Sequence, residues 1–278
     1  MQVLTPSTLD EALAMLAAGG TPPTPIAGGT DLLVSWHHKP KDGLRFLDLS
    51  RLTGELGDAR LSPDELVLGA LTTYWDVICS VEIASAFPLL AQAARQVGAV
   101  QIQTRGTWAG NIGNGSPAAD GVPVLMAYDA AVVLQSVGGR REVPLDAYWT
   151  GYKQSVRRPE ELIVAVRLPR GRRDFEWFHK VGSRTAQTIS KVGVAAVHDD
   201  RGWRIAANSV APFVCRCRNL ERALDAGRAF ANPDEVRAAL AADISPIDDI
   251  RSTAEYRARV LSRLIYFALA AQSSAAVS

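Results

Sequence analysis

The chain has 278 residues, a formal net charge of +1 at pH 7, 47% hydrophobic residues and 21% charged residues. This composition is ordinary for a globular protein of two or three compact units, and it disfavours nucleic-acid binding, which needs a clustered basic face. The start of the chain has no signal-peptide pattern, and the longest apolar tract, residues 264–271, is too short to cross a bilayer. We therefore expect no membrane span. The three cysteines, an odd number, disfavour a disulfide framework, so we expect the protein in the reducing cytoplasm.

Local patterns in the first part of the chain predict a helix and short strands. Ser7 followed by Asp10 is typical of a helix N-cap, and leucines then recur at helical spacing until a Gly-Gly pair ends the pattern. Residues 45–49 and 66–70 predict strands, and residues 88–97 predict a helix with one buried face. This helix leads directly into a Gly-rich stretch.

The rest of the chain predicts strands first and helices last, with a polar break at 169–173 that marks a domain boundary. Strands are expected at 131–134, 142–143 and 162–168 before the break, and at 175–180, 192–198 and 202–210 after it, followed by helices at 218–226, 233–241 and 254–271. Strands followed by helices favour an α+β unit after the break, with a three-stranded antiparallel sheet covered by helices.

Residues 104–120, TRGTWAGNIGNGSPAAD, have the composition of a binding loop rather than of a core element, and residues 26–32, IAGGTDL, are a second loop of this kind. Glycines let backbone N–H groups approach an anion closely, and successive amides form a concave site for phosphate oxygens. Asp120 would repel phosphate, but its carboxylate accepts well from sugar hydroxyls. Two such loops predict one large ligand that offers both groups, as a nucleotide does. Taken alone, the Gly28-Gly29 pair is equally typical of an ordinary turn.

Neither loop has the spacing of a dinucleotide-binding fingerprint or of a P-loop, so both folds are disfavoured. Metal binding is not expected, because the adjacent His37 and His38 would point apart, and Cys215 and Cys217 have no second cysteine pair. No G-x-S-x-G elbow is present, and no catalytic residue is predicted.

Three motifs resemble the FAD-binding medium subunit of the molybdenum hydroxylases, which include the xanthine dehydrogenase and aerobic carbon monoxide dehydrogenase families. The motifs are AGGTDL at 27–32, T-x-x-G-N at 107–111 and SPAAD at 116–120, and the similarity continues through Tyr152-Lys153, the strand after Glu160 and the K-x-x-x-R-x-A pattern from Lys180. It implies an α+β fold, with a two-part FAD-binding domain of the PCMH/vanillyl-alcohol-oxidase type and a small C-terminal α+β domain. The expected parts are residues 1–54, 55–170 and 171–278.

The resemblance also implies a set of cofactor-binding residues. They are Ile26, Ala27, Gly28, Gly29, Thr30, Asp31, Leu32, Thr107, Ala109, Gly110, Asn111, Ser116, Asp120, Leu162 and Lys180. Amides near Gly28-Gly29 and Gly110 would bind the pyrophosphate, Asp120 the ribose, and Lys180 would lie toward the isoalloxazine ring. Ala109 departs from the usual pattern, which has a second glycine there, so its methyl group is expected to shift the loop slightly.

Three of these assignments have ordinary alternatives, and Trp108 outside the set has two expected roles. Lys180 could extend to solvent from a strand edge. Leu162 could be a core leucine, and Asn111 could serve a turn as asparagine does in any loop. Trp108 is expected either to stack on the cofactor or to cover a subunit interface.

The implied activity is electron transfer in an oxidoreductase. FAD on this chain would receive electrons from two [2Fe–2S] clusters of a small partner subunit, after a large subunit with a molybdenum-pterin cofactor has oxidised the substrate. The flavin would then reduce an external acceptor, NAD, quinone or dioxygen, in a heterohexamer made of two heterotrimers. Two alternatives remain: a stand-alone flavin oxidoreductase, and a scaffold subunit that has lost FAD.

Overall fold

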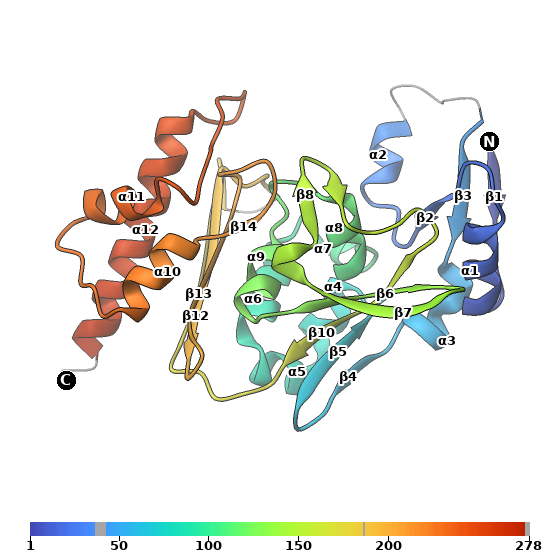
Figure 1. Cartoon of the computed structure of the whole chain (residues 1–278), viewed down its shortest axis with the longest axis horizontal. Helices are drawn as coiled ribbons and strands as arrows, with labels where there is room; N and C mark the ends of the chain where they lie inside the picture. Colours follow the sequence, from blue (N-terminus) through green and yellow to red (C-terminus); the bar gives the residue numbers. More distant parts are fainter. Residues whose placement is uncertain (37–42, 186, 276–278) are drawn as a thin grey trace.

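The computed structural model describes residues 1–36, 43–185 and 187–275 (Figure 1). Its first part has three short strands in one parallel sheet, in the order β1-β3-β2. The elements are β1 (Gln2–Leu4), α1 (Leu9–Ala17), β2 (Thr24–Ile26), α2 (Leu32–Trp36), β3 (Arg45–Asp48), a 3₁₀ turn (Ser50–Leu52) and α3 (Thr53–Leu56). The N-cap of α1 is Thr8, whose Oγ1 accepts from the Glu11 amide, so the predicted cap at Ser7 is wrong by one residue.

The second part is a five-stranded antiparallel sheet in the order β4-β5-β10-β6-β7, packed against a group of helices. Its elements are β4 (Ala59–Leu61), β5 (Glu65–Gly69), α4 (Tyr74–Cys79), α5 (Val81–Ala86), α6 (Pro88–Gln96), α7 (Val100–Gln103), α8 (Trp108–Asn114), α9 (Gly121–Ala127), β6 (Ala131–Ser136), β7 (Gly139–Pro144), a 3₁₀ turn (Leu145–Ala147), β8 (Trp149–Gly151), β9 (Gln154–Ser155) and β10 (Leu162–Pro169).

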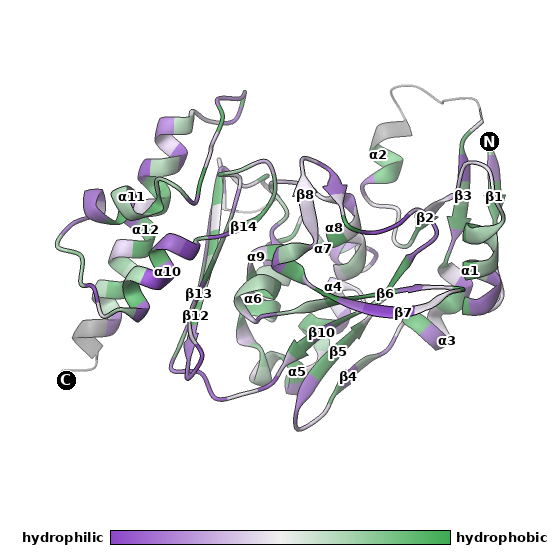
Figure 2. Ribbon diagram, in the orientation of Figure 1, coloured by the Kyte–Doolittle hydropathy of each residue, from purple (hydrophilic) through white to green (hydrophobic). Residues whose placement is uncertain are grey.

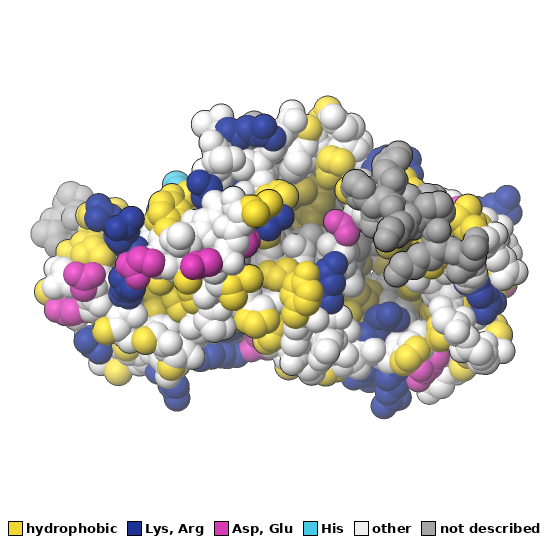
Figure 3. Space-filling model, turned by 90° about the horizontal axis from the view of Figure 1, so that it is seen from above, with side chains coloured by type: hydrophobic (Ala, Val, Ile, Leu, Met, Phe, Trp, Pro, Cys, Tyr) yellow, Lys and Arg dark blue, Asp and Glu magenta, His cyan; other side chains and the backbone are white. Residues whose placement is uncertain are grey.

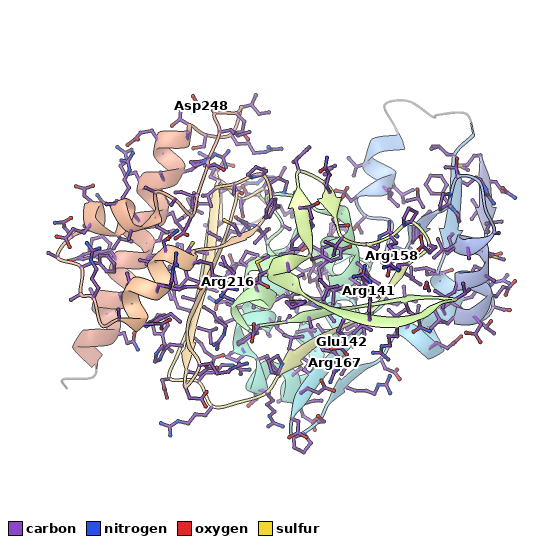
Figure 4. The ribbon with its side chains drawn as sticks, viewed as in Figure 1. Arg141, Glu142, Arg158, Arg167, Arg216 and Asp248 are labelled. Atoms are coloured by element: carbon purple, nitrogen blue, oxygen red, sulfur yellow. The ribbon has the colours of Figure 1, made fainter. Side chains whose placement is uncertain are left out.

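Hydropathy separates the central strands of this sheet from its edge. Figure 2 shows that β5 and β10 are mostly hydrophobic, whereas β7 is hydrophilic along much of its length. A charged edge strand resists pairing with another chain. Arg167 of β10 contacts Glu65 at 2.7 Å and also pairs with Glu142 of β7, beside which it lies in Figure 4. The side chains of both ion pairs are partly exposed to solvent, so these pairs contribute little to the stability of the fold.

The third part is an antiparallel sheet in the order β11-β12-β13-β14, with three helices after it. Its elements are β11 (Phe175–Val181), β12 (Val192–Asp199), β13 (Gly202–Asn208), β14 (Cys215–Arg216), α10 (Arg218–Asp225), α11 (Pro233–Leu240) and α12 (Ala254–Ala275). The sheet therefore has four strands rather than the three predicted. The two-residue β14 is too short to produce a periodic pattern of its own.

Both faces of this last sheet are buried, which makes it the middle layer between the C-terminal helices and the second part (Figure 1). On β12, Val194 and Ala196 belong to the core shared with the helices, whereas Ala195 and Val197 belong to the core of the second part. Alternate residues of a strand point to opposite faces, so the apolar run of β12 serves both cores. The C-terminal part is thus packed tightly against the region that precedes it.

Arg173, in the connection between β10 and β11, packs this connection against the second part. Its guanidinium lies 4.6 Å from the ring centre of Phe87 and 4.5 Å from that of Tyr128, and it donates to the carbonyls of Ala86 and Pro169. Its side chain is only 6% exposed. Cation–π contacts are strongest when they are removed from water.

Replacing Arg173 by leucine is therefore expected to lower the free energy of unfolding by about 2 kcal/mol, through lost cation–π contacts and two unpaired carbonyls. Urea unfolding of the full chain measures this value. Arg172→Leu is the matched control, because that side chain is 93% exposed. Equal unfolding free energies for the two variants would contradict this role of Arg173.

Of the helices that the structure describes, none combines the length and the apolar character that crossing a bilayer requires.

Candidate functional site

The first predicted loop leaves the parallel sheet at the end of β2 and enters α2. The carbonyl of Ile26, the last residue of β2, accepts from the Leu49 amide, and α2 begins at Leu32. Between them, Gly29 has a φ of +70°, a left-handed conformation that glycine adopts without strain. Its carbonyl accepts from the Leu33 amide at 3.0 Å. The chain therefore makes a tight strand-to-helix turn at this point.

The two predicted loops meet at Gly28. A Cβ atom added to this glycine would lie 1.8 Å from the carbonyl oxygen of Arg105, so no other residue fits without a shift of the backbone. Arg105 Nε also donates to the Gly28 carbonyl at 3.4 Å. The structure thus brings residues 26–32 against the turn that precedes α8.

Successive amides of the first loop have no partner among the residues that the structure describes. Within the part of the chain that the structure describes, the N–H groups of Gly28, Gly29, Thr30 and Asp31 donate to no protein acceptor. The region is partly buried, and unpaired amides in such a place fit an anionic ligand. This agrees with a phosphate-bearing cofactor.

The second stretch, residues 104–120, is wrongly predicted as a loop throughout, since seven of its residues form α8. Thr107 is the N-cap, and its Oγ1 accepts from the Gly110 amide at 2.9 Å. Trp108 is fully buried, with its ring centre 4.8 Å from that of Tyr74. Neither the cofactor-stacking nor the interface role expected for Trp108 is correct, because its side chain belongs to the core. The methyl group of Ala109 also lies in this core.

In the described structure, three buried polar atoms on or beside α8 have no hydrogen-bond partner: the Tyr74 hydroxyl, Trp108 Nε1 and Asn111 Oδ1. Asn111 Oδ1 lies 3.4 Å from where a Cβ of Gly121 would be, next to Asp120. Burial raises the pKa of Tyr74, and the negative charge of Asp120 raises it further, so the phenol keeps its proton as a donor. Buried polar atoms are rarely left unpaired, so this place suits a polar ligand group or ordered water.

Ser116, by contrast, uses its hydroxyl oxygen in the local turn, where it accepts from the Ala118 amide.

Asp120 and Lys180 form a buried ion pair between the second and third parts. Lys180 Nζ lies 2.7 Å from Asp120 Oδ2 and donates to the Gln96 carbonyl at 2.8 Å. The two side chains are 11% and 3% exposed for Asp120 and Lys180, respectively, so Lys180 does not extend to solvent. Because the two groups touch, they face the same section of any ligand. The ribose role of Asp120 and the ring role of Lys180 stay predictions.

Leu162 stands at the start of β10 and is 3% exposed in the main core. The preceding Glu161 is buried and accepts from Arg141 Nε at 2.6 Å and from the Arg158 amide at 2.7 Å. The hydrogen bonds from Arg141 lower the pKa of Glu161 despite burial, so this carboxylate stays charged and anchors the start of the strand. Contact of Leu162 with a flavin stays a prediction.

Two further polar residues reach the site and were not predicted. Ser190 and Asn208 both donate to Asp120 from the third part. Their local sequences carry no motif, and only the packing of the last sheet brings them there. His37 and His38 lie outside the described residues, and no cluster of three or more potential metal ligands occurs among the residues described.

Comparison with known proteins identifies the family of the chain. The family described as "FAD binding domain in molybdopterin dehydrogenase" matches residues 1–171, and "CO dehydrogenase flavoprotein C-terminal domain" matches residues 177–271. The carbon monoxide dehydrogenase medium chain of Hydrogenophaga pseudoflava is 31% identical over 95% of this chain and 94% of its own. A putative xanthine dehydrogenase FAD-binding subunit of Escherichia coli is 27% identical over 93% of this chain and 91% of its own.

The fold is similar to a solved structure as well. A structure of carbon monoxide dehydrogenase from Hydrogenophaga pseudoflava, which lacks the Mo-pyranopterin moiety of the molybdenum cofactor, superimposes with a TM-score of 0.88 and 29% identity over 99% of this chain and 97% of that chain. The predicted α+β class is confirmed. The chain belongs to the family of FAD-binding medium subunits of the molybdopterin hydroxylases. It is an oxidoreductase subunit of a multi-subunit complex.

Proposed function

We propose that this chain holds FAD across the 26–32 loop and the N-terminal end of α8, with the pyrophosphate on the amides of Gly28 to Asp31. The predicted pyrophosphate contact of Gly110 is not part of this proposal, because its amide already donates to Thr107 Oγ1. The observation that carries the proposal is the contact of Gly28 with Arg105, which joins two loops beside four amides that have no acceptor in the described part of the chain. Asp120 and Lys180 would bind a hydroxyl or carbonyl group of the same ligand. Asn111 and the Tyr74 hydroxyl offer further hydrogen bonds to it.

The bound FAD would accept electrons from two [2Fe–2S] clusters of a small partner subunit and deliver them to NAD, quinone or dioxygen. The chain itself contributes positioning and charge. Lys180 is a fixed cation in a place with little water, which favours electron density on a nearby flavin. This role needs no general acid, base or nucleophile.

The proposed complex also contains a large subunit with a molybdenum-pterin cofactor, as a dimer of heterotrimers. Exposed hydrophobic side chains support a docking role for the face that carries α2. Figure 3 shows hydrophobic side chains gathered near the centre of this face, where the surface is hollowed. Leu33 and Val34 of α2 are 46% and 64% exposed.

Free thiols at the three cysteines support a reducing, cytoplasmic location.

The visible spectrum of the purified full chain tests the cofactor. We expect flavin bands in the parent and their loss in Gly29→Val, because a β-branched residue is strained at a φ of +70°. Gly171→Val is the matched control, since a Cβ at that glycine meets no atom within 4 Å. A parent chain that is colourless and takes up no added FAD would refute FAD binding.

The partners need a separate experiment. The tagged chain, purified from its own cells, is expected to carry iron and molybdenum in addition to flavin, as measured by metal analysis. Flavin without either metal would instead favour the stand-alone oxidoreductase.

A further inference from the structure

Two donors from the C-terminal part converge on one oxygen of Asp120. Ser190 Oγ donates to Asp120 Oδ1 at 2.5 Å, and Asn208 Nδ2 donates to the same oxygen at 3.3 Å and to the Ala119 carbonyl at 3.1 Å. Ser190 is 1% exposed and Asn208 is 0% exposed. Buried donors of this kind hold a carboxylate in a single orientation.

The pattern of these bonds decides which oxygen of Asp120 remains for a ligand. A carboxylate oxygen has about two acceptor positions. Oδ1 uses both, on Ser190 and Asn208, whereas Oδ2 accepts only from Lys180 among the described residues. The remaining acceptor position is therefore on Oδ2, on the side of the lysine.

The backbone around the two donors is itself held in place. Asn208 pairs across the sheet with Gly193, where a Cβ would lie 2.8 Å from the Asn208 amide oxygen, so the glycine makes room for this side chain. Ser209 Oγ donates to the Ser190 carbonyl at 3.1 Å. Arg257 of α12, with a side chain 4% exposed, donates to the carbonyls of Lys191 and Ser209 at 2.8 and 2.9 Å. A buried polar network thus connects α12 with Asp120.

We infer that Ser190 and Asn208 are positioning residues, through which the C-terminal part determines how tightly this chain binds FAD. They act by directing Asp120 Oδ2 toward the ligand and touch no ligand themselves. The inference rests on the proposed FAD site. It adds to that site two residues of the C-terminal part and the specific oxygen that serves the ligand.

Titration of the flavin-free full chain with FAD, followed by flavin fluorescence, tests the inference. Ser190→Ala is expected to weaken FAD binding about tenfold, the loss of one hydrogen bond to a charged group. Asn208→Asp is expected to weaken it further, because it places a second negative charge beside Asp120. Ser262→Ala is the matched control. Ser262 is also buried in the C-terminal part, but among the described residues its hydroxyl donates only to the Arg259 carbonyl of its own helix.

A double-mutant cycle distinguishes positioning from general support of the fold. In an Asp120→Ala chain, Ser190→Ala is expected to change FAD affinity less than twofold, because the group that it positions is gone. The same loss in both backgrounds, or parental affinity in Ser190→Ala alone, would overturn the inference while leaving the FAD site intact. A parent that takes up no FAD would instead refute the proposed function, and the inference with it.

Discussion

Gly28→Ala is expected to weaken FAD binding by about 100-fold, which corresponds to about 2.7 kcal/mol. The added methyl group would lie 1.8 Å from the Arg105 carbonyl oxygen and 2.5 Å from its carbon, both of which are backbone atoms. Backbone atoms cannot rotate away as a side chain does, so the two loops must separate. The amides of residues 28–31, which have no acceptor among the described residues, then move away from the turn that precedes α8. Titration of the flavin-free chain with FAD measures the loss.

The control for this change is Gly54→Ala, because a Cβ at Gly54 in α3 meets no atom within 4 Å. Alanine also has the higher helix propensity, so this variant should be as stable as the parent or more so. Thermal unfolding without FAD shows whether Gly28→Ala has simply unfolded. Unchanged FAD affinity in a folded Gly28→Ala chain would contradict the assignment of the first loop to the cofactor.

Lys180→Met is expected to lower the free energy of unfolding by about 3 kcal/mol even without FAD. The change removes the cation from a pair in which neither side chain is more than 11% exposed, and it leaves Asp120 as an uncompensated buried charge. Denaturant unfolding of the flavin-free chain measures the effect. Lys191→Met is the control, since the Lys191 ammonium lies 5.7 Å from the ring centre of Tyr256 and forms no ion pair with a described carboxylate.

The double variant Lys180→Met with Asp120→Asn separates stability from binding. With both charges gone, the unfolding free energy should return to within about 1 kcal/mol of the parent. FAD binding should stay weak, because the cation and the carboxylate are both missing. A double variant that binds FAD as tightly as the parent would exclude this pair from the site.

The long periodic elements could be predicted from the sequence, and short or locally atypical ones could not. The helix expected at 88–97 is α6, and the strands expected at 162–168 and 192–198 are β10 and β12, each within two residues. Their apolar runs are long enough to show a period. The four-residue α3 and the two-residue β14 contain too few positions to do so.

The candidate site shows where local composition misleads. Glycine and asparagine in 104–120 indicate a loop, but Thr107 caps a helix there and Gly115, at a φ of +62°, ends it. Trp108 and Ile112, one helical turn apart, are both fully buried, and burial outweighs low propensity. Ser190 and Asn208 could not be predicted, because their role depends on how the third part packs against Asp120. Such long-range contacts leave no local pattern in the chain.

The partners of Asp120 are made long after Asp120 itself during synthesis of the protein. Asp120 leaves the ribosome early, while Lys180, Ser190 and Asn208 follow 60, 70 and 88 residues later along the chain. Domains fold as they emerge, N-terminal first. The donors to the Asp120 carboxylate are therefore synthesised after it. The hydrogen bonds around Asp120 are complete only when the third part has packed against the second. The proposed FAD site therefore needs the whole chain, and a chain truncated after β10 is expected to take up no FAD in the titration.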